Sequence, residues 1–326
     1  MSGGVKASAG RVFRSTPPKV GLEQGLELEQ IGTDTYQNKQ LPWTWPGSQV
    51  VPGGILAALA TNAAYNTLTS DFAIDMLQIQ FLAGPSPKAP MQLQVQRLND
   101  GGRFATRLIT TTQAGRTISH VTCSFVRAAS FGGPSISHSP QRATSDKISD
   151  ITLDDLDEGR DDDGPWLRYQ RLSLTNDRLG YDPEKSLPEH LVHTFAAKVF
   201  PEVQASDKRM HALGIIALSD FHVLNCPAIV HHLQLGQSAL GDVHRTPRTP
   251  DFDRYTSLNH SIYFHRHEGF RADELKYIEA RSPWSGRRRG FVETRIFDSK
   301  GEGELIATCT QETYYVLKEG ILKEKL

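Results

Sequence analysis

The chain has 326 residues, of which 38% are hydrophobic, and a formal net charge of -1 at pH 7. This length allows two domains with sizeable cores, and the balanced charge excludes the strongly basic surface of a nucleic-acid-binding protein. No apolar run approaches the roughly 18 residues that a membrane-spanning helix needs.

The three cysteines, Cys123, Cys226 and Cys309, are widely spaced along the chain. They form neither a disulfide framework nor a metal-binding motif, which favours a reduced intracellular setting, and we expect no metal and no other cofactor. Residues 1–20 hold four basic side chains and no acidic one. We interpret them as a flexible tail, with a weak transit peptide as the alternative.

Residues 21–127 are predicted to form the first domain. Two glycines after Pro52 are typical of a turn into a helix, and the apolar residues that follow predict a largely buried helix over 55–68. Apolar and polar residues then roughly alternate over 104–111 and 117–126, with a glycine-containing break between them. This period of two indicates a β-hairpin.

Residues 128–189 differ in composition from the sequence on either side. Ser, Pro and Gly come first, and seven acidic residues follow between positions 154 and 163. A calcium-binding loop would need alternating oxygen ligands around a central glycine and a distal glutamate, and that register is missing. We therefore predict a linker with a solvated acidic run.

Residues 190–326 are predicted to form a second domain with a similar plan. A helical pattern covers 213–224, interrupted by Ser219-Asp220, and strand patterns cover 291–297 and 304–317. Asp, Ser and Gly between the two strand patterns suit a turn.

The second hairpin resembles the first in sequence. Thr-Arg and Thr-Cys pairs occur at 106–107 and 122–123, and again at 294–295 and 308–309, at nearly the same spacing. Gln311 stands where the first copy has Phe125. We infer a duplicated fold in which one half keeps the chemistry.

These patterns predict an α+β architecture. In each half, a strongly curved antiparallel sheet wrapped around one central helix would bury both elements. Two such sheets can join edge to edge into one continuous sheet, which removes exposed edges.

The end of the chain bears on its location. The last three residues, Glu324-Lys325-Leu326, share two positions with the Ser-Lys-Leu peroxisomal signal but begin with a bulky acid. We expect a cytoplasmic protein, with the peroxisome as the alternative.

Several segments resemble one family in order along the chain. In the second half these are Ala-Leu-Ser-Asp at 217–220, Ser-Leu-Asn-His-Ser-Ile-Tyr-Phe-His-Arg at 257–266, Phe-Arg-Ala-Asp-Glu at 270–274, Arg-Gly-Phe-Val at 289–292 and Ala-Thr-Cys-Thr-Gln-Glu at 307–312. Similar first-half segments lie between 81 and 125. The chain resembles the TesB-like acyl-CoA thioesterase II family over roughly 50–127 and 190–317, and fungal polyketide pathways contain similar chains.

The resemblance implies a double hotdog fold that hydrolyses acyl thioesters without a covalent intermediate. The family's catalytic Asp, Ser or Thr, and Gln correspond to Asp220, Ser257 and Gln311. The residue types suit activation of water, because a carboxylate accepts a proton, a hydroxyl relays or orients one, and an amide holds the water without charge. Backbone N–H groups at a helix N-terminus near Asp220 are candidates for stabilising the oxyanion.

Each of these residues also has a simpler interpretation. Asp220 could cap a helix, Ser257 could belong to a turn, and Gln311 could face solvent from a strand. The ordered conjunction of all three favours the catalytic interpretation.

Two groups of cationic residues are candidates for substrate binding. His260, His265 and Arg266 are predicted to lie on one strand, with His260 and Arg266 on one face and His265 on the other; they could contact pantetheine or phosphate, or form buried structural hydrogen bonds. A second group could bind the phosphates of coenzyme A or an acidic carrier protein, or simply form an exposed hairpin tip; it consists of Arg287, Arg288 and Arg289.

Three functional hypotheses remain open. The first is an acyl-CoA thioesterase in lipid and fatty acid metabolism. The second is a hydrolase that releases a polyketide or fatty acyl chain from an acyl carrier protein. The third is a non-catalytic acyl-thioester binder or a hotdog hydratase, weakened by the retained triad and by the lack of an Asp-x-x-x-x-His segment. The resemblance also implies a homo-oligomer of double hotdog units.

Overall fold

A computed structural model describes residues 21–44, 49–143, 167–176, 186–204, 208–220, 223–233, 251–299 and 303–321. The predicted tail, the acidic run and the C-terminal Glu324-Lys325-Leu326 lie outside the described residues. No helix in the described ranges is long and apolar enough to cross a membrane.

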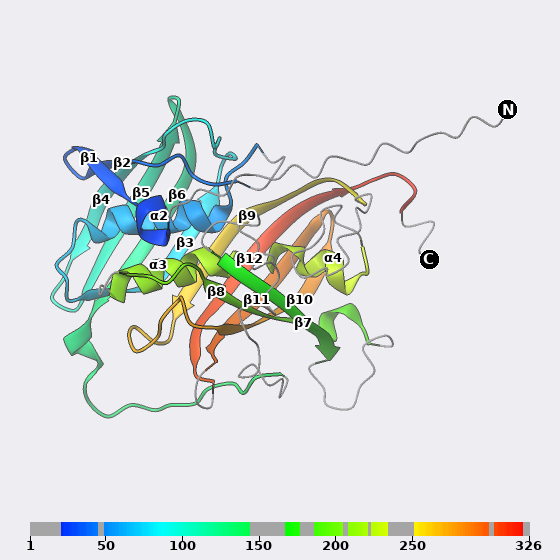
Figure 1. The fold of residues 1–326 in the computed structure, drawn as a ribbon. Helices are drawn as coiled ribbons and strands as arrows, with labels where there is room; N and C mark the ends of the chain where they lie inside the picture. The colour runs from blue at the N-terminus through cyan, green and yellow to red at the C-terminus, as the bar shows by residue number, and fades with distance from the viewer. Residues whose placement is uncertain are drawn as a thin grey trace.

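Twelve strands form one open sheet in which every neighbouring pair is antiparallel. The strand order is β1-β2-β4-β5-β6-β3-β9-β12-β11-β10-β8-β7 (Figure 1). The strands are β1 (Leu28–Gly32), β2 (Thr35–Asn38), β3 (Phe72–Phe81), β4 (Gln92–Asp100), β5 (Phe104–Gln113), β6 (Arg116–Arg127), β7 (Leu167–Asn176), β8 (Leu191–Val199), β9 (Phe252–Phe264), β10 (Lys276–Gly286), β11 (Arg289–Asp298) and β12 (Leu305–Leu317).

The two halves of the sheet meet at β3 and β9, whose pairing runs from Met76 opposite Tyr263 to Gln80 opposite Asn259. Each half supplies six strands, and the order on one side of this seam matches the order on the other. The predicted double hotdog with one continuous sheet is confirmed.

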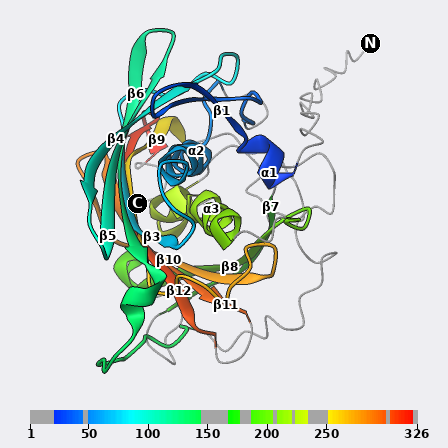
Figure 2. The same ribbon diagram turned by 90° about the vertical axis from the view of Figure 1, so that its left-hand side faces the viewer.

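Two central helices, α2 (Gly53–Tyr65) and α3 (Lys208–Ser219), lie side by side inside the curve of the sheet (Figure 2). Helix α2 is buried on almost all sides, as its run of Ala, Leu and Ile predicts. Helix α3 begins and ends earlier than the predicted range 213–224, so Asp220 follows the helix directly. The shorter helical elements are α1 (Leu22–Gly25), η1 (Ala128–Phe131), η4 (Pro188–His190), η5 (Val223–Asn225) and α4 (Cys226–Val230).

Strand β7 falls inside the range 128–189 that we predicted to be a linker. It pairs with β8 from Leu167 opposite Val199 to Asn176 opposite Leu191 and forms the outer edge of the second half. Leu167 and Tyr169, and then Leu172 and Leu174, each alternate with polar residues on either side of a register shift, and the acidic composition nearby obscured this strand pattern.

Both predicted hairpins are present, as β5–β6 and β11–β12. Left-handed backbone forms the turn of the first of these and of a further hairpin, β10–β11. The turn between β5 and β6 consists of Ala114 and Gly115, with φ values of 49° and 75°. The turn between β10 and β11 consists of Arg287 and Arg288, with φ values of 50° and 62°. Two-residue turns of this kind favour Asn and Gly, so two arginines here carry backbone strain.

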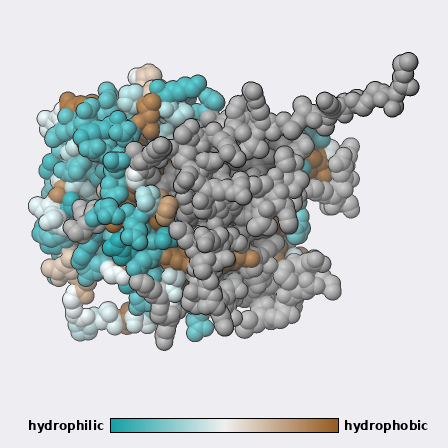
Figure 3. All heavy atoms as spheres, viewed as in Figure 1, coloured by the Kyte–Doolittle hydropathy of each residue, from teal (hydrophilic) through white to brown (hydrophobic). Residues whose placement is uncertain are grey.

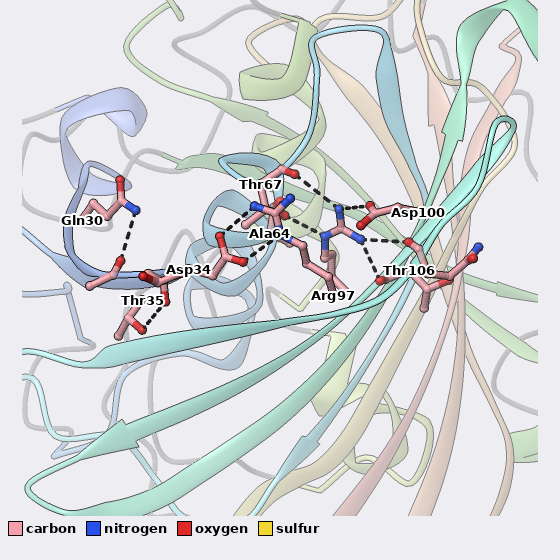
Figure 4. A network of polar contacts seen from close by, with 12 residues as sticks. Gln30, Asp34, Thr35, Ala64, Thr67, Arg97, Asp100 and Thr106 are labelled. Atoms are coloured by element: carbon pink, nitrogen blue, oxygen red, sulfur yellow. Dashed lines mark hydrogen bonds and ion pairs between the residues drawn. The ribbon is translucent and has the colours of Figure 1, made fainter.

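The arginine of the first repeat, Arg107, is fully buried at the C-terminal end of α2. Its guanidinium donates to Thr67 Oγ1 at 2.7 Å and to Asp100 Oδ1 at 2.5 Å. Figure 4 shows Thr67 and Asp100 in this network, with the ion pair between Asp34 and Arg97 beside it. The network anchors the end of α2 that is remote from Gly53 and Gly54.

The surface of the N-terminal half that faces the viewer in Figure 3 is mostly hydrophilic, with hydrophobic residues scattered among polar ones. The apolar side chains of this half are concentrated on the inner face of the sheet and around the two central helices. The main apolar core thus lies between the sheet and the two central helices, where the two halves of the molecule meet.

Candidate active site

Asp220 lies where the two halves of the molecule touch. It follows the last residue of α3 and is only 6% exposed. Its Oδ2 accepts a hydrogen bond of 2.8 Å from the backbone N–H of Gly54, in the first turn of α2. Asp220 thus binds a helix N-terminus, as its simpler interpretation suggested, but the helix belongs to the other half of the chain.

Gly53 and Gly54 make this approach possible. A Cβ atom on Gly54 would lie 2.7 Å from the carbonyl oxygen of Ala217 and 2.9 Å from Cβ of Asp220, and one on Gly53 would meet the ring of Phe81 at 2.6 Å. Sequence reasoning treated the two glycines only as a helix entry. Their adjacency was the available signal, because paired glycines at a helix start also mark close backbone approach.

Gln311 connects the carboxylate to the serine. Its side chain is 1% exposed on β12, and its Nε2 donates to Asp220 Oδ1 at 2.5 Å and to Ser257 Oγ at 2.8 Å. Its Oε1 is buried and has no hydrogen-bond partner in the described part of the chain. The three residues that the sequence singled out therefore converge in one cluster, in which Asp220 and Gln311 are buried, Ser257 is partly accessible, and one amide oxygen is available to accept a further hydrogen bond.

Burial controls the charge of Asp220. Removal from water raises the pKa of its carboxyl to about 6, although the N–H groups of Gly54 and Gly53 and the amide of Gln311 act in the opposite direction. The carboxylate is therefore ionised at neutral pH and more basic than an exposed Asp. This is the property of a group that accepts a proton from water near neutral pH.

A β-bulge in β9 sets the direction of Ser257. Asn259 pairs with Glu312 and Ser257 pairs with Thr313, so Leu258 has no partner in β12. An extra residue reverses the alternation of side chains, which brings Ser257 to the same inner face as His260, three positions further on.

His260 lies behind the cluster rather than in it. Its Nε2 is 2.8 Å from Oγ of Ser219, and Ser219 in turn donates to the carbonyl of Ile216 in α3. Burial lowers the pKa of His260 to about 4, so its ring is neutral at physiological pH. The contact fixes the end of α3 against β9, next to Asp220.

His265 and Arg266 lie beyond the end of β9, at the opposite end of the strand from its Phe252 start. His265 Nε2 is 2.8 Å from Oγ1 of Thr308, and Arg266 forms an ion pair of 2.8 Å with Glu304. The structure does not bring either side chain to the Asp220 cluster.

The three consecutive arginines occupy the tip of the β10–β11 hairpin. Arg289 forms an ion pair of 3.0 Å with Glu312, and its guanidinium lies 5.9 Å from the ring centre of Trp284. Because Glu312 and Gln311 are neighbours on one strand, Arg289 faces the side of the sheet opposite to Gln311. The cluster is thus a hairpin tip separated from the triad by the sheet.

Two family models match the chain. The model for the N-terminal domain of acyl-CoA thioesterases matches residues 41–138, and the model for the C-terminal domain matches residues 151–315. The chain belongs to the acyl-CoA thioesterase family. The family resemblance inferred from the motifs is thereby confirmed, and the chain is a member of a family of thioester hydrolases.

Relatives of this acyl-CoA thioesterase family member align over nearly its whole length. Acyl-coenzyme A thioesterase 8 from Mus musculus is 28% identical over 92% of the chain and 90% of the relative. Acyl-CoA thioesterase 2 from Haemophilus influenzae is 24% identical over 88% of the chain and 94% of the relative. Peroxisomal acyl-coenzyme A thioester hydrolase 1 from Saccharomyces cerevisiae is 22% identical over 90% of the chain and 94% of the relative.

Solved structures share the fold. The acyl-CoA thioesterase II TesB2 from Mycobacterium marinum has a TM-score of 0.67 at 24% identity, over 92% of this chain and 99% of that one. The tesB protein of Mycobacterium avium has a TM-score of 0.66 at 19% identity, over 90% of this chain and 98% of that one. Within the described residues of this family member, no three His, Cys, Asp or Glu side chains are grouped as a metal site.

Proposed function

We propose that the chain is an acyl-CoA thioesterase that activates one water molecule with Asp220, Ser257 and Gln311. The observation that carries the proposal is the pair of hydrogen bonds from Gln311 Nε2, at 2.5 Å to the carboxylate and 2.8 Å to the serine hydroxyl. These bonds join a buried base, an orienting amide and a hydroxyl at one point. Family membership and the names of the relatives support the same reaction.

In the proposed reaction, water attacks the thioester carbonyl while Asp220 takes one of its protons. The carbon–oxygen bond forms and the carbonyl becomes an oxyanion. Collapse of this intermediate breaks the carbon–sulfur bond, and the proton on Asp220 passes to the leaving thiolate. The products are a free acid and coenzyme A, and no covalent acyl-enzyme forms.

Gln311 and Ser257 would orient the water. Because Gln311 uses Nε2 for Asp220 and Ser257, its Oε1 can accept a hydrogen bond from the water. Ser257 accepts from Gln311, which leaves its own O–H to donate to the water or to the carbonyl oxygen of the substrate. The N-terminus of α2 carries a partial positive charge beside Asp220, which favours both the carboxylate and a nearby oxyanion.

The test measures thiol release from a panel of acyl-CoAs and acyl carrier proteins by wild type, Asp220→Asn and Gln311→Ala. We expect loss of the general base to lower the rate about 10²- to 10⁴-fold. Full activity in both variants would overturn the proposed site. Asp253→Asn is the matched control, because Asp253 is exposed on the same strand as Ser257.

The same panel separates the alternative donors. Turnover of carrier-bound chains alone would favour a polyketide or fatty acyl hydrolase acting on a carrier protein. Binding without turnover by wild type would favour a non-catalytic acyl-thioester binder, and water addition to an enoyl-CoA would favour a hydratase.

We also propose that the hairpin tip at Arg287 and Arg288 contributes to binding of phosphate or of an acidic carrier. Asn and Gly suit the left-handed turn, so Arg287→Asn with Arg288→Gly removes both charges without new strain. We expect KM to rise for acyl-CoA. An unchanged KM for both acyl-CoA and acyl carrier protein would remove these two residues from the proposed substrate site, and Arg289→Ala tests the third arginine in the same assay.

Substrate roles for His260, His265 and Arg266 stay predictions, as do the homo-oligomer and the location. Light scattering on the purified protein measures the oligomer. Imaging of the full chain with and without its last three residues measures whether Glu324-Lys325-Leu326 directs it to peroxisomes rather than the cytoplasm. One relative is named as peroxisomal, which supports making that comparison.

A further inference from the structure

Tyr255 carries a buried hydroxyl that the proposed mechanism does not use. The residue lies two positions before Ser257 on β9, and its cross-strand partner on β12 is Tyr315. Residues two apart in a strand share a face, so Tyr255 and Ser257 both project toward the helix side of the sheet. Arg254 and Thr256, which alternate with them, are exposed.

The hydroxyl of Tyr255 has no hydrogen-bond partner among the residues that the structure describes, although it is buried. The residue as a whole is partly accessible, as Ser257 is. A buried hydroxyl without a partner is unfavourable, and native proteins keep few such groups. Those that remain call for an explanation, and a group supplied by a ligand is one.

The surroundings keep this hydroxyl neutral. Burial raises the pKa of Tyr255 well above its usual value, with further contributions from Cys226 and Tyr315. Phe252 packs against the ring at a centroid distance of 5.1 Å. A neutral phenol can donate a hydrogen bond, and because burial of a charge is costly, an uncharged oxygen of a ligand suits this setting better than a phosphate.

Tyr315 provides a contrast on the neighbouring strand. Its hydroxyl is 2.7 Å from Oγ of Ser285, so its hydrogen bond is made within the protein. Two tyrosines at one cross-strand position therefore differ in one respect: one hydroxyl is satisfied internally and the other is not.

We propose that Tyr255 is a substrate-binding residue that donates a hydrogen bond to an oxygen of the acyl thioester a few bonds away from the reacting carbonyl. The two positions on β9 are separated by roughly 7 Å along the strand, so this oxygen is not the thioester carbonyl placed at Ser257. It belongs either to the pantetheine amide or to an oxygen substituent on the acyl chain. This inference rests on the proposed function, since it assumes that the substrate reaches Ser257.

The test compares Tyr255→Phe with Tyr315→Phe on octanoyl-CoA and on 3-hydroxyoctanoyl-CoA. We expect Tyr255→Phe to raise KM about 3- to 10-fold, the usual worth of one hydrogen bond, with kcat changed less. A rise for both substrates assigns the partner to pantetheine, and a rise for the hydroxyacyl substrate alone assigns it to the acyl chain. An unchanged KM for both overturns the proposal.

The stability of Tyr255→Phe is a second measurement, because a hydroxyl that binds substrate and one that is bonded within the protein predict different changes in the denaturant midpoint. Because the Tyr255 hydroxyl has no internal partner, Tyr255→Phe should leave the denaturant midpoint unchanged or raise it, whereas Tyr315→Phe should lower it. A lower midpoint for Tyr255→Phe would show that its hydroxyl is bonded within the protein and would overturn the proposal.

Measuring the Kd of octanoyl-CoA and 3-hydroxyoctanoyl-CoA in an Asp220→Asn background keeps the two proposals distinguishable. Weaker binding on adding Tyr255→Phe supports the role of Tyr255 even if Asp220 proves not to be the base. Equal Kd values for both ligands with and without Tyr255→Phe overturn it, whatever the fate of the triad.

Discussion

Ser257 and His260 project from the same face of β9 although they are three residues apart. Ser257 bonds to Gln311, and His260 bonds to Ser219 at the end of α3. In a regular strand, residues at this separation face opposite sides, and the unpaired Leu258 corrects the register. Because the separation between the two residues is odd, the bulge at Leu258 is what places both side chains on one face.

Deletion of both Leu258 and Asn259 should lower thiol release sharply. It would make Ser257 the direct neighbour of His260 in a regular strand and turn its side chain away from Gln311, so we expect a loss of at least about 10²-fold, as for a displaced catalytic group. Deletion of Leu258 alone is the control, because it removes the bulge and one residue together and leaves Ser257 two positions before His260, on the same face and opposite Thr313. Circular dichroism checks that both variants keep the sheet. A fully active, folded double-deletion variant would show that the register of β9 does not set the direction of the serine.

The pH dependence of hydrolysis should have an acid limb governed by Asp220. Its pKa of about 6 means that the carboxylate is protonated below this pH and no longer accepts a proton. We expect kcat/KM to fall about tenfold per pH unit below pH 6 and to level off above it. Stopped assays on one acyl-CoA from pH 4.5 to 8.5 measure the limb. An acid limb with an apparent pKa near 4 would contradict the assignment of a buried carboxylate as the base.

Asp220→Asn should stabilise the protein while inactivating it. The pKa rises from 3.8 in the unfolded chain to about 6 in the fold, so the native state binds more protons between these values and stability falls as pH rises through them. Above pH 6 this cost is on the order of 3 kcal/mol.

Urea denaturation of wild type and Asp220→Asn at pH 7.5 and at pH 4 measures this effect. The variant should be more stable by about 1–3 kcal/mol at the higher pH, and the difference should shrink toward pH 4. A variant that is less stable than wild type at pH 7.5 would indicate that the charge is compensated by its hydrogen bonds.

Gly54→Ala should damage both stability and activity. Its new methyl group would lie 2.7 Å from the carbonyl oxygen of Ala217 and 2.9 Å from Cβ of Asp220, so α2 and α3 must separate. Overpacking of this kind costs about 1–3 kcal/mol, and displacement of Asp220 should lower kcat about 10²-fold. Gly102→Ala is the control, because nothing lies within 4 Å of its added atom. Equal kcat values for the two variants would contradict a close helix contact.

Phe125→Gln should destabilise the protein without creating a second active site. Phe125 is fully buried, and its ring packs edge-on against Tyr65 at 5.0 Å. A buried polar amide in place of this ring should cost about 3–5 kcal/mol. Phe104→Gln, at a 49% exposed position, should change stability by less than about 0.5 kcal/mol. Denaturant midpoints compare the two, and thiol release that increased in Phe125→Gln would contradict the division between the halves.

The first half retains the outline of the site but not its chemistry. Thr61 and Asn62 in α2 correspond to Ser219 and Asp220 at the end of α3. Thr61 Oγ1 lies 3.8 Å from Sγ of Cys123, and Ser219 contacts Cys309, the cysteine at the matching position of the second repeat. Asn62 donates to the carbonyl of Leu26 at 2.8 Å and so serves to hold α1. The asymmetry between Gln311 and Phe125 extends to this second pair.

The sequence by itself determined the local elements and the residue types of the site. Alternation of side chains predicts the β5–β6 and β11–β12 hairpins, because burial of one face of a strand imposes a period of two. Gly115 in the β5–β6 turn and the Gly53-Gly54 pair at the start of α2 could also be interpreted from the sequence, because backbone sterics act within a few residues. The family motifs, found in the expected order along the chain, identified Asp220, Ser257 and Gln311 as the candidate catalytic residues.

Only the tertiary structure decided how these residues meet. The bond between Gly54 and Asp220 joins positions 166 residues apart, and the seam between β3 and β9 brings the two halves into register. Contacts at such separations depend on the packing of whole elements rather than on local preference. The bulge at Leu258 likewise leaves no mark in composition, because it is defined by pairing with β12.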